Sequence, residues 1–349
     1  MSKIVFFVGP YHGVVTGQSK CFKVAVDSVE DSYIFSTGGE GLSHLYKISI
    51  SIWSLVRFII LSLFLIKKDI VVYITPSRTL AGFCKEIGFF TFSLLFKCKL
   101  ICHWHGSDLY DFLSSQNFLL RKFIIKIYSM ANVHIVLTEG MKEQLKLIST
   151  KEVVVLPNFH DIDFYPDCNI NHSFNITFMS NIIYEKGVLD AVEAFKIFRQ
   201  EIEGNSNVKL NIVGQVLDSS LLDKINGQER VVIHGPLYGE KKDLLLGETD
   251  VFIFPSFYKT EAFPLVVLEA MATHNSIIAY DHNYISDFFN FDGGWLVDKR
   301  NVSQLSKKLS VLFYDRELLS KQKESNYKLS KDYTQTSYKE KVNNICSRM

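Results

Sequence analysis

The chain has 349 residues, enough for two domains that each bury a hydrophobic core. Its formal net charge is only +1 at neutral pH, which excludes the overall basic footprint of a nucleic-acid-binding protein. Residues 1–165 carry 17 Lys and Arg against 13 Asp and Glu, and the remainder carries 21 against 24. A mildly basic first half could face anionic lipid or a phosphorylated acceptor, or the asymmetry could have no function.

Six cysteines are scattered through the chain, without a C-x-x-C pair or the Cys/His spacing of a metal site. They are Cys21, Cys84, Cys98, Cys102, Cys168 and Cys346. Scattered thiols are typical of a reducing compartment. The first residues run directly into an apolar strand and lack the cleavage site of a signal peptide. We therefore expect a cytoplasmic protein.

Short apolar runs predict a parallel sheet in the first half of the chain. They lie at residues 4–8, 69–74, 99–103, 133–137 and 153–156. The first run leads into a loop with glycines at positions 9, 13 and 17, which is not the G-x-G-x-x-G spacing of a dinucleotide-binding turn. This loop, with Gly17 at its end, either brings backbone amides to a ligand or is a plain strand-to-helix turn.

Two apolar helices in the first half raise the question of membrane contact. In residues 48–66, Ser51 and Arg57 belong to a polar stripe, and nine residues between Arg57 and the next lysine are too few to span a bilayer. We favour a core-packed helix, with an interfacial helix as the alternative. Residues 118–128 form a basic amphipathic helix, for which we favour packing on the sheet with a solvated basic face. Peripheral attachment to an anionic membrane is the alternative.

Polar side chains gather where the strand at 99–103 ends. His103, His105 and Asp108 lie at this carboxyl end, the side on which parallel sheets bind ligands. Alternation along a strand would send the two histidines to opposite faces, and no further metal ligands are apparent. We expect His105 to face the ligand, because Gly106 follows and leaves room.

A proline-bounded, polar segment at 157–166 predicts the domain boundary. It contains Asp161 and Asp163, a D-x-D pattern that some sugar-transferring enzymes use to hold a metal, but a linker pair is the favoured interpretation. We predict domains at 1–165 and 166–325, followed by a C-terminal helical segment at 326–349.

The second half repeats the alternation of strands and helices. Strands are predicted at 176–179, 209–214, 231–235, 251–255, 276–280 and 293–297, and a helix at 190–200. Gly214 ends the second of these strands, and Lys186 lies in the loop after the first. Two successive α/β halves imply an α/β fold with two Rossmann-like domains facing a cleft.

Residues 256–272 hold two carboxylates in an unusual setting. Glu269 lies within an apolar helix whose first turn is predicted to hold Pro264, and Glu261 lies in the turn before it. A helix that is apolar on nearly every face is buried, and a buried carboxylate is costly unless it is paired. The segment therefore has the features of a ligand site.

In order and spacing, these motifs resemble the retaining glycosyltransferases of family 4, which have the GT-B fold. Glu261 and Glu269 fit the E-x7-E motif, Lys186 and Gly187 fit the K-G loop, and the segment from His105 fits an H-G motif. The resemblance covers essentially the whole chain. It implies that the last helix crosses back to the first domain.

The resemblance also implies roles for individual residues. Glu269 would hold the ribose hydroxyls of the nucleotide, and the catalytic contacts would be Glu261 and His105, both on the donor sugar. The remaining positions would meet the diphosphate: Lys186 by charge, Gly17 through its loop, and Phe263 and Leu265 through backbone amides. Gly214 is a further candidate for nucleotide binding.

Two positions depart from the family pattern. Asn181 stands where the family commonly has arginine, so one diphosphate cation is missing. The loop at 281–286 lacks the small glycine-containing turn usual there, which affects the prediction of donor-sugar recognition.

The function implied is transfer of a sugar from a UDP- or GDP-sugar to a glycan or a polyprenyl-diphosphate-linked acceptor, in O-antigen or capsule synthesis. The family needs no metal or other cofactor and retains the donor's anomeric configuration. The alternatives are a nucleotide-sugar epimerase of the same fold and a non-catalytic nucleotide-sugar-binding partner. A nicotinamide-dependent oxidoreductase is disfavoured by the missing glycine fingerprint.

Overall fold

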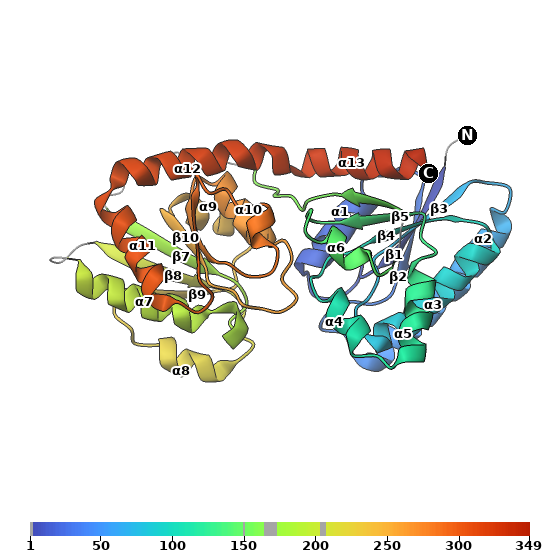
Figure 1. The fold of residues 1–349 in the computed structure, drawn as a ribbon, viewed down its shortest axis with the longest axis horizontal. Coiled ribbons are helices and arrows are strands. Elements are labelled where there is room, and N and C mark those ends of the chain that lie inside the picture. Colours follow the sequence, from blue (N-terminus) through green and yellow to red (C-terminus); the bar gives the residue numbers. More distant parts are fainter. Residues whose placement is uncertain (1–2, 149–150, 164–172, 203–206) are drawn as a thin grey trace. The chain divides into compact units, whose positions relative to one another are not determined.

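The computed structural model describes residues 3–148, 151–163, 173–202 and 207–349 (Figure 1). Cys168 and the predicted boundary at residue 165 lie outside the described residues. The chain divides into two compact units. The first combines Met1–Asn158 with Gln335–Met349, and the second is Phe159–Thr334.

The first unit is built on a six-stranded sheet with the order β2-β1-β3-β4-β5-β6, in which every pair is parallel. The strands are β1 Ile4–Gly9, β2 Ser32–Ser36, β3 Ile70–Ile74, β4 Lys99–His103, β5 Val133–Val136 and β6 Glu152–Val155. Every strand predicted in this half is present. The additional strand, β2, lies at the edge of the sheet and is partly exposed, so its sequence lacks the continuous apolar run of a central strand.

Helices cover both faces of this sheet. They are α1 Gly17–Val26, α2 His44–Phe64, α3 Leu80–Leu95, α4 Leu109–Ser114, α5 Phe118–Tyr128, α6 Lys142–Leu145 and α13 Gln335–Arg348. Because parallel crossovers are right-handed, α2, α3 and α5 share one face, and α1, whose crossover runs the opposite way, lies on the other. α13 packs beside α1, where the Tyr338 hydroxyl lies 3.5 Å from the Cys21 carbonyl oxygen.

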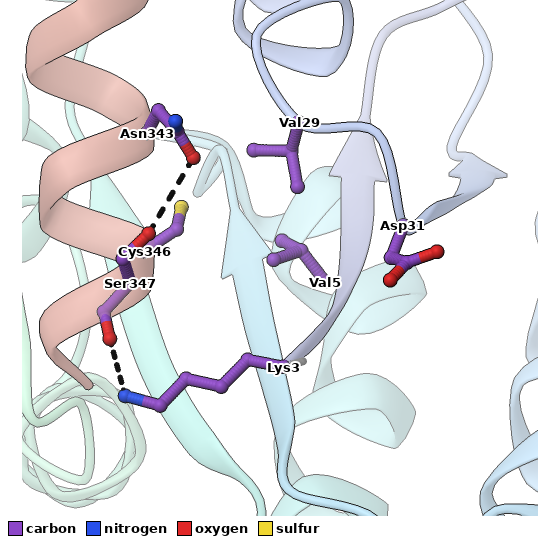
Figure 2. Close-up of a pocket in the computed structure, with 7 residues that line it drawn as sticks. All are labelled: Lys3, Val5, Val29, Asp31, Asn343, Cys346 and Ser347. Carbon is purple, nitrogen blue, oxygen red and sulfur yellow. Dashed lines mark hydrogen bonds between the residues drawn. The ribbon is translucent and has the colours of Figure 1, made fainter. Parts of the chain in front are cut away.

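The end of α13 also meets the amino end of β1. Figure 2 shows Lys3 donating a hydrogen bond to the Ser347 carbonyl beside a small hollow whose wall includes Val5, Val29 and Cys346. The hollow lies at the amino end of β1, opposite the strand ends that carry the predicted site residues of this unit.

α2 contradicts the expectation of a core-packed helix. Its buried residues form a narrow stripe: Ser51, Ser54, Phe58 and Ser62. The serines of the polar stripe are therefore buried, whereas Arg57 is exposed. Only 22% of the most apolar stretch of the helix is buried. In the described part of the chain, α2 is the one helix whose length and composition would suffice to cross a membrane. The serines can be buried because Ser62 Oγ, for example, donates to the Phe58 carbonyl at 2.7 Å within the helix.

The second unit has its own parallel sheet, in the order β12-β11-β10-β7-β8-β9. Its strands are β7 Phe174–Met179, β8 Val208–Val213, β9 Val231–Gly235, β10 Val251–Phe254, β11 Ser276–Tyr280 and β12 Gly294–Val297. The six predicted strands of this half are all present. Counted within the unit, the order is 3-2-1-4-5-6, the doubly wound arrangement, whose ligand crevice opens where the order reverses. That reversal lies between β7 and β10.

The helices of the second unit enclose an apolar core. They are α7 Val188–Glu201, α8 Leu222–Ile225, α9 Glu240–Gly247, α10 Leu265–Ala272, α11 Val302–Tyr314 and α12 Arg316–Ser330. Phe195 and Phe198 of α7 and Leu309 of α11 are fully buried against the sheet. This packing fixes the strands, and so fixes the loops at their carboxyl ends.

Candidate functional site

The loops after β7 and β10 are joined at the reversal point of the second sheet. Gly187 has φ +78°, and a Cβ built there would lie 2.0 Å from the Pro255 carbonyl oxygen. The Phe257 amide donates to the Glu185 carbonyl at 2.9 Å. Position 187 therefore requires glycine on two grounds, its left-handed backbone and the closeness of the neighbouring loop. The two loops form one rigid rim.

Lys186 and Glu261 meet across this rim. Lys186 Nζ donates to Glu261 Oε2, and the two side chains are 14% and 20% exposed. Ser256 Oγ lies 3.4 Å from the same carboxylate oxygen, and the ammonium sits 4.5 Å from the centre of the Tyr258 ring. The structure therefore brings together two of the predicted site residues, 75 positions apart in the chain.

Asn283 holds the Glu261 loop in place. Its amide nitrogen lies 3.2, 3.1 and 2.8 Å from the carbonyl oxygens of Tyr258, Lys259 and Glu261. Its φ is +52°, a conformation that Asn tolerates better than most residues. In the 281–286 loop, which has no glycine, Asn283 thus supplies the left-handed turn. Sequence reasoning missed this residue, although an Asn in a polar turn is a recognisable signal.

α10 begins directly after this loop. Its N-cap is Pro264, one position before the first helical residue, rather than within the first turn as predicted. Proline offers no side-chain cap, so the first backbone N–H groups, from Leu265 onward, have no capping side chain. Phe263 precedes them with its ring stacked on Phe288, the ring centres 3.9 Å apart. The positive end of the α10 dipole therefore points toward the rim.

Glu269 is buried inside α10 and has a cationic partner. Lys242 Nζ of α9 lies 2.8 Å from Glu269 Oε1 and 3.2 Å from Asp243 Oδ1. The side chains of Glu269 and Lys242 are 8% and 13% exposed. Burial lowers the pKa of nearby His160, and the Glu269 charge opposes that shift. Sequence reasoning predicted that Glu269 needs a partner but did not find Lys242, which lies in a charged run without a motif.

Two further predicted positions lie at the same edge of the sheet. Gly214 follows β8 with φ +152°, and a Cβ there would lie 1.8 Å from the Ser180 carbonyl oxygen. Asn181, in the loop after β7, is exposed. The Gly214 backbone therefore packs closely against the start of the loop that carries Lys186.

In the first unit, the rings of His103 and His105 are neighbours. Their centres are 4.0 Å apart, which contradicts the prediction that they point to opposite faces. The reason is that β4 ends at His103, so strand alternation does not reach His105. His103 Nδ1 pairs with the Tyr73 hydroxyl. Burial lowers the pKa of His105 to about 3, with a contribution from the Arg78 charge, so its imidazole is neutral at physiological pH. Its Nε2 is buried without a hydrogen-bond partner.

The space beside Gly106 is filled by Arg78. A Cβ at Gly106 would lie 2.2 Å from the guanidinium carbon. The glycine therefore makes room for this side chain, and the prediction that it makes room for a ligand is wrong. Arg78 forms an ion pair with Asp108. The loop that carries Arg78 is held by Glu86, whose carboxylate accepts from the Ser77 amide at 2.8 Å and pairs with its hydroxyl at 2.7 Å. Sequence reasoning missed Arg78 as a neighbour of the candidate site.

Gly17 is the first residue of α1, at the carboxyl edge of the first sheet. Thr16 caps the helix and accepts from the Ser19 amide at 3.2 Å, while the Thr16 amide donates to Ser19 Oγ at 2.8 Å. Gly17 is exposed, so its backbone is accessible. In the part of the chain that the structure describes, no cluster of three or more His, Cys, Asp or Glu side chains could hold a metal ion.

Known proteins resemble the chain in the sequence of its second unit and in its fold. Residues 169–329 match the family Glycosyl transferases group 1. None of the curated proteins matches the chain significantly. The crystal structure of HepE from Anabaena in complex with UDP has a TM-score of 0.78 at 12% identity, covering 99% of this chain and 100% of that one. A glycosyltransferase from Rickettsia africae has a TM-score of 0.75 at 17% identity, covering 100% and 99%.

A third solved structure, sucrose-phosphate synthase from Thermosynechococcus elongatus, has a TM-score of 0.73 at 13% identity, covering 99% of this chain and 98% of its own. At these identities the likeness establishes the fold, and it confirms the prediction of an α/β, two-domain GT-B architecture. The family match, at residues 169–329, covers most of the second unit.

Proposed function

We propose that the protein is a retaining glycosyltransferase of family 4 that moves a sugar from a UDP- or GDP-sugar to a glycan or a polyprenyl-diphosphate-linked acceptor. The observation that carries this proposal is the pairing of Lys186 with Glu261 where the second sheet reverses its order, next to the uncapped start of α10. A cation, a carboxylate and a helix N-terminus are the groups that a sugar diphosphate requires. The match of residues 169–329 to the glycosyl transferases supports the same assignment.

In this proposal the donor separates the ion pair. Lys186 turns to the diphosphate and neutralises the charge that develops as it leaves, and Glu261 accepts hydrogen bonds from hydroxyls of the donor sugar. Backbone N–H groups of Phe263 and Leu265 donate to the phosphates. Since Asn181 replaces the usual arginine, the reaction depends more heavily on Lys186 than it would with two cations.

The remaining residues position the substrate. Glu269 accepts hydrogen bonds from the ribose hydroxyls and keeps Lys242 as its counter-ion, while the close backbone at Gly214 leaves room for the nucleotide. In the first unit, His105 has a neutral ring with an unpartnered Nε2, which suits a hydrogen bond to a sugar hydroxyl. The exposed start of α1 at Gly17 suits contact with phosphate.

We assign no nucleophile and no metal to the reaction. The acceptor attacks from the face that the diphosphate leaves, so that catalysis rests on positioning and on stabilising the departing phosphate. We place the enzyme in O-antigen or capsule synthesis in the cytoplasm, with peripheral contact between its first unit and the membrane that holds a lipid-linked acceptor.

A thermal-shift screen with UDP-, GDP- and ADP-sugars tests donor binding. A ligand at one hundred times its dissociation constant stabilises the folded state by about 2.7 kcal/mol. The preferred donor then enters a turnover assay with the wild type and with Glu261→Gln. We expect the variant to lose about 100- to 1,000-fold in rate, the range typical of a lost transition-state contact. Glu193→Gln is the control, because Glu193 is an exposed carboxylate on α7.

Each outcome distinguishes the alternatives. If no nucleotide-sugar raises the melting temperature, the proposal is wrong. Turnover whose product stays linked to the nucleotide indicates an epimerase. Donor binding without transfer or hydrolysis, unchanged in Glu261→Gln, indicates a non-catalytic partner.

A further inference from the structure

An extensive apolar surface covers one face of the first unit. We call it the apolar helix face and define it by the exposed apolar side chains of α2, α3 and α5. On α2 these are Leu45, Tyr46, Ile48, Ile52, Trp53, Val56, Ile60, Leu63 and Phe64; on α3, Leu80, Leu94 and Leu95; and on α5, Phe118, Leu119 and Phe123. Trp53 is 64% exposed and Phe64 is 82% exposed. A patch of this kind on a soluble protein marks an interaction site.

The pattern along α2 shows that this exposure is built into the helix. Ile52, Val56 and Ile60 recur at four-residue spacing and so share one side, opposite the buried serines. The buried side is already complete: Phe58 packs against Phe89 of α3, the ring centres 5.4 Å apart. No rotation of the helix could bury the apolar side without removing Phe58 from the core.

The three helices present this face together. α2 and α3 are in close contact, because a Cβ at Gly88 would lie 2.6 Å from a methyl carbon of Leu55. α3 and α5 are joined through Phe83 and Phe123, the ring centres 6.1 Å apart. In Figure 1 they form one layer of neighbouring helices. The apolar helix face therefore spans several helices of one rigid layer.

Apart from one buried glutamate, the charged residues on these helices are all basic. Residues 44–68 contain Lys47, Arg57, Lys67 and Lys68 and no Asp or Glu. α5 contains Arg121, Lys122 and Lys126 and no acidic residue. α3 has one carboxylate, Glu86, which is buried and bonded to Ser77. An apolar surface bordered by Lys and Arg, with an exposed Trp, is complementary to the interface of an anionic bilayer.

From these features we infer that the apolar helix face docks onto an anionic lipid surface, with α2 lying in the plane of the interface. The alternative occupant, a second copy of the chain, would bring two basic surfaces together. The inference specifies the membrane contact included in the proposed function, but it does not depend on sugar transfer.

Co-sedimentation with vesicles tests the inference. The full-length protein is mixed with phosphatidylcholine vesicles and with vesicles containing roughly 30% phosphatidylglycerol, at about 0.1 M and 0.5 M salt. We expect binding to the anionic vesicles that weakens at the higher salt. The double variant Ile52→Ser/Trp53→Ser is expected to bind about tenfold or more weakly, since it removes two large apolar anchors. Lys122→Gln/Lys126→Gln should weaken binding less and reduce its salt dependence.

The control is Val311→Ser/Tyr314→Ser, which removes two exposed apolar side chains from α11 in the second unit and should bind as the wild type does. The inference is overturned if the wild type does not sediment with anionic vesicles, or if Ile52→Ser/Trp53→Ser binds equally well. If light scattering shows that the wild type is a dimer and Ile52→Ser/Trp53→Ser is a monomer, and the wild type does not bind vesicles, the face binds a second copy of the chain instead. The nucleotide-sugar melting shift, measured on the same preparations, separates failure of docking from failure of the proposed function.

Discussion

α2 and α10 are both strongly apolar helices, yet they bury opposite kinds of residues. α10 lies within the second unit and buries most of its length, including the carboxylate of Glu269. α2 buries a stripe made largely of serines and leaves its larger apolar residues exposed. Apolar composition alone therefore does not show which side of a helix packs.

The difference follows from how each buried polar group is satisfied. Glu269 is tolerated because Lys242, from another helix, reaches it. The hydroxyl of Ser62 is satisfied by its own helix, through the Phe58 carbonyl. A buried polar group that needs a partner from another element, such as Glu269, indicates a candidate binding site. A serine that bonds within its own helix is a small side chain that lets the helix pack close to the sheet.

Breaking the Glu269 pair should have the largest effect. Glu269→Ala removes one of the two carboxylates that pair with the largely buried Lys242 ammonium, so we expect the free energy of unfolding to fall by about 3 kcal/mol. The measurement is urea denaturation. The surface variant Glu193→Ala, which breaks an exposed pair with Lys196, should cost about 0.5 kcal/mol or less. The double variant Glu269→Leu/Lys242→Leu should recover much of the loss; if it does not, burial of the pair is not the cause.

A larger side chain in the serine stripe of α2 should have the next largest effect on stability. Ser62→Leu forces a large side chain between α2 and the sheet, and we expect a loss of about 1–3 kcal/mol in the free energy of unfolding. The adjacent Leu63→Ser changes an exposed position and should fall within about 0.5 kcal/mol of the wild type. Equal effects of the two substitutions in thermal or urea unfolding would show that α2 packs with a different face.

Glu86 is a further buried carboxylate, and its hydrogen bonds come from Ser77 rather than from an ion pair. Burial raises its pKa from 4.5 to about 7. The native carboxyl therefore keeps its proton to a higher pH than the unfolded one. Its contribution to stability is complete below about pH 4.5 and is lost as the pH rises through 7, by at most about 1.4 kcal/mol per pH unit. Glu86→Gln should remove this slope in unfolding measured from pH 4 to 8. A slope that persists in the variant would assign it to other groups.

The smallest effect is expected for Ser62→Ala. The hydroxyl bonds only within its own helix, and alanine is the stronger helix former, so the free energy of unfolding should change by about 0.5 kcal/mol or less. A loss above about 1 kcal/mol in calorimetry would show that Ser62 has a partner outside α2, and the contrast with Glu269 would then disappear.

The sequence predicts most of this fold because buried parallel strands are continuous apolar runs. β2 escaped prediction since it is partly exposed and lacks a continuous apolar run. The sequence marks a polar stripe on α2 but does not predict that its serines are buried, because polarity is a good guide to exposure only when hydroxyls lack local acceptors. Likewise, the alternation of side chains along a strand did not predict the position of the His105 ring, because β4 ends before this residue.

The motif residues of the site could be predicted, but their partners could not. Lys186, Glu261 and Glu269 lie at recognisable spacings. Lys242 and Arg78 lie on other elements, and their pairing depends on how the helices and loops pack. Asn283 could have been found, since the missing glycine required some residue able to take a positive φ.

The division of the chain has a consequence for its synthesis. The first unit is completed by α13, whose Tyr338, Val342 and Cys346 are buried. On the ribosome, these residues emerge after the whole of Phe159–Thr334. The second unit, although encoded later than most of the first, is therefore the one that can finish folding first, and the nascent first unit must wait for the last helix to fill its core.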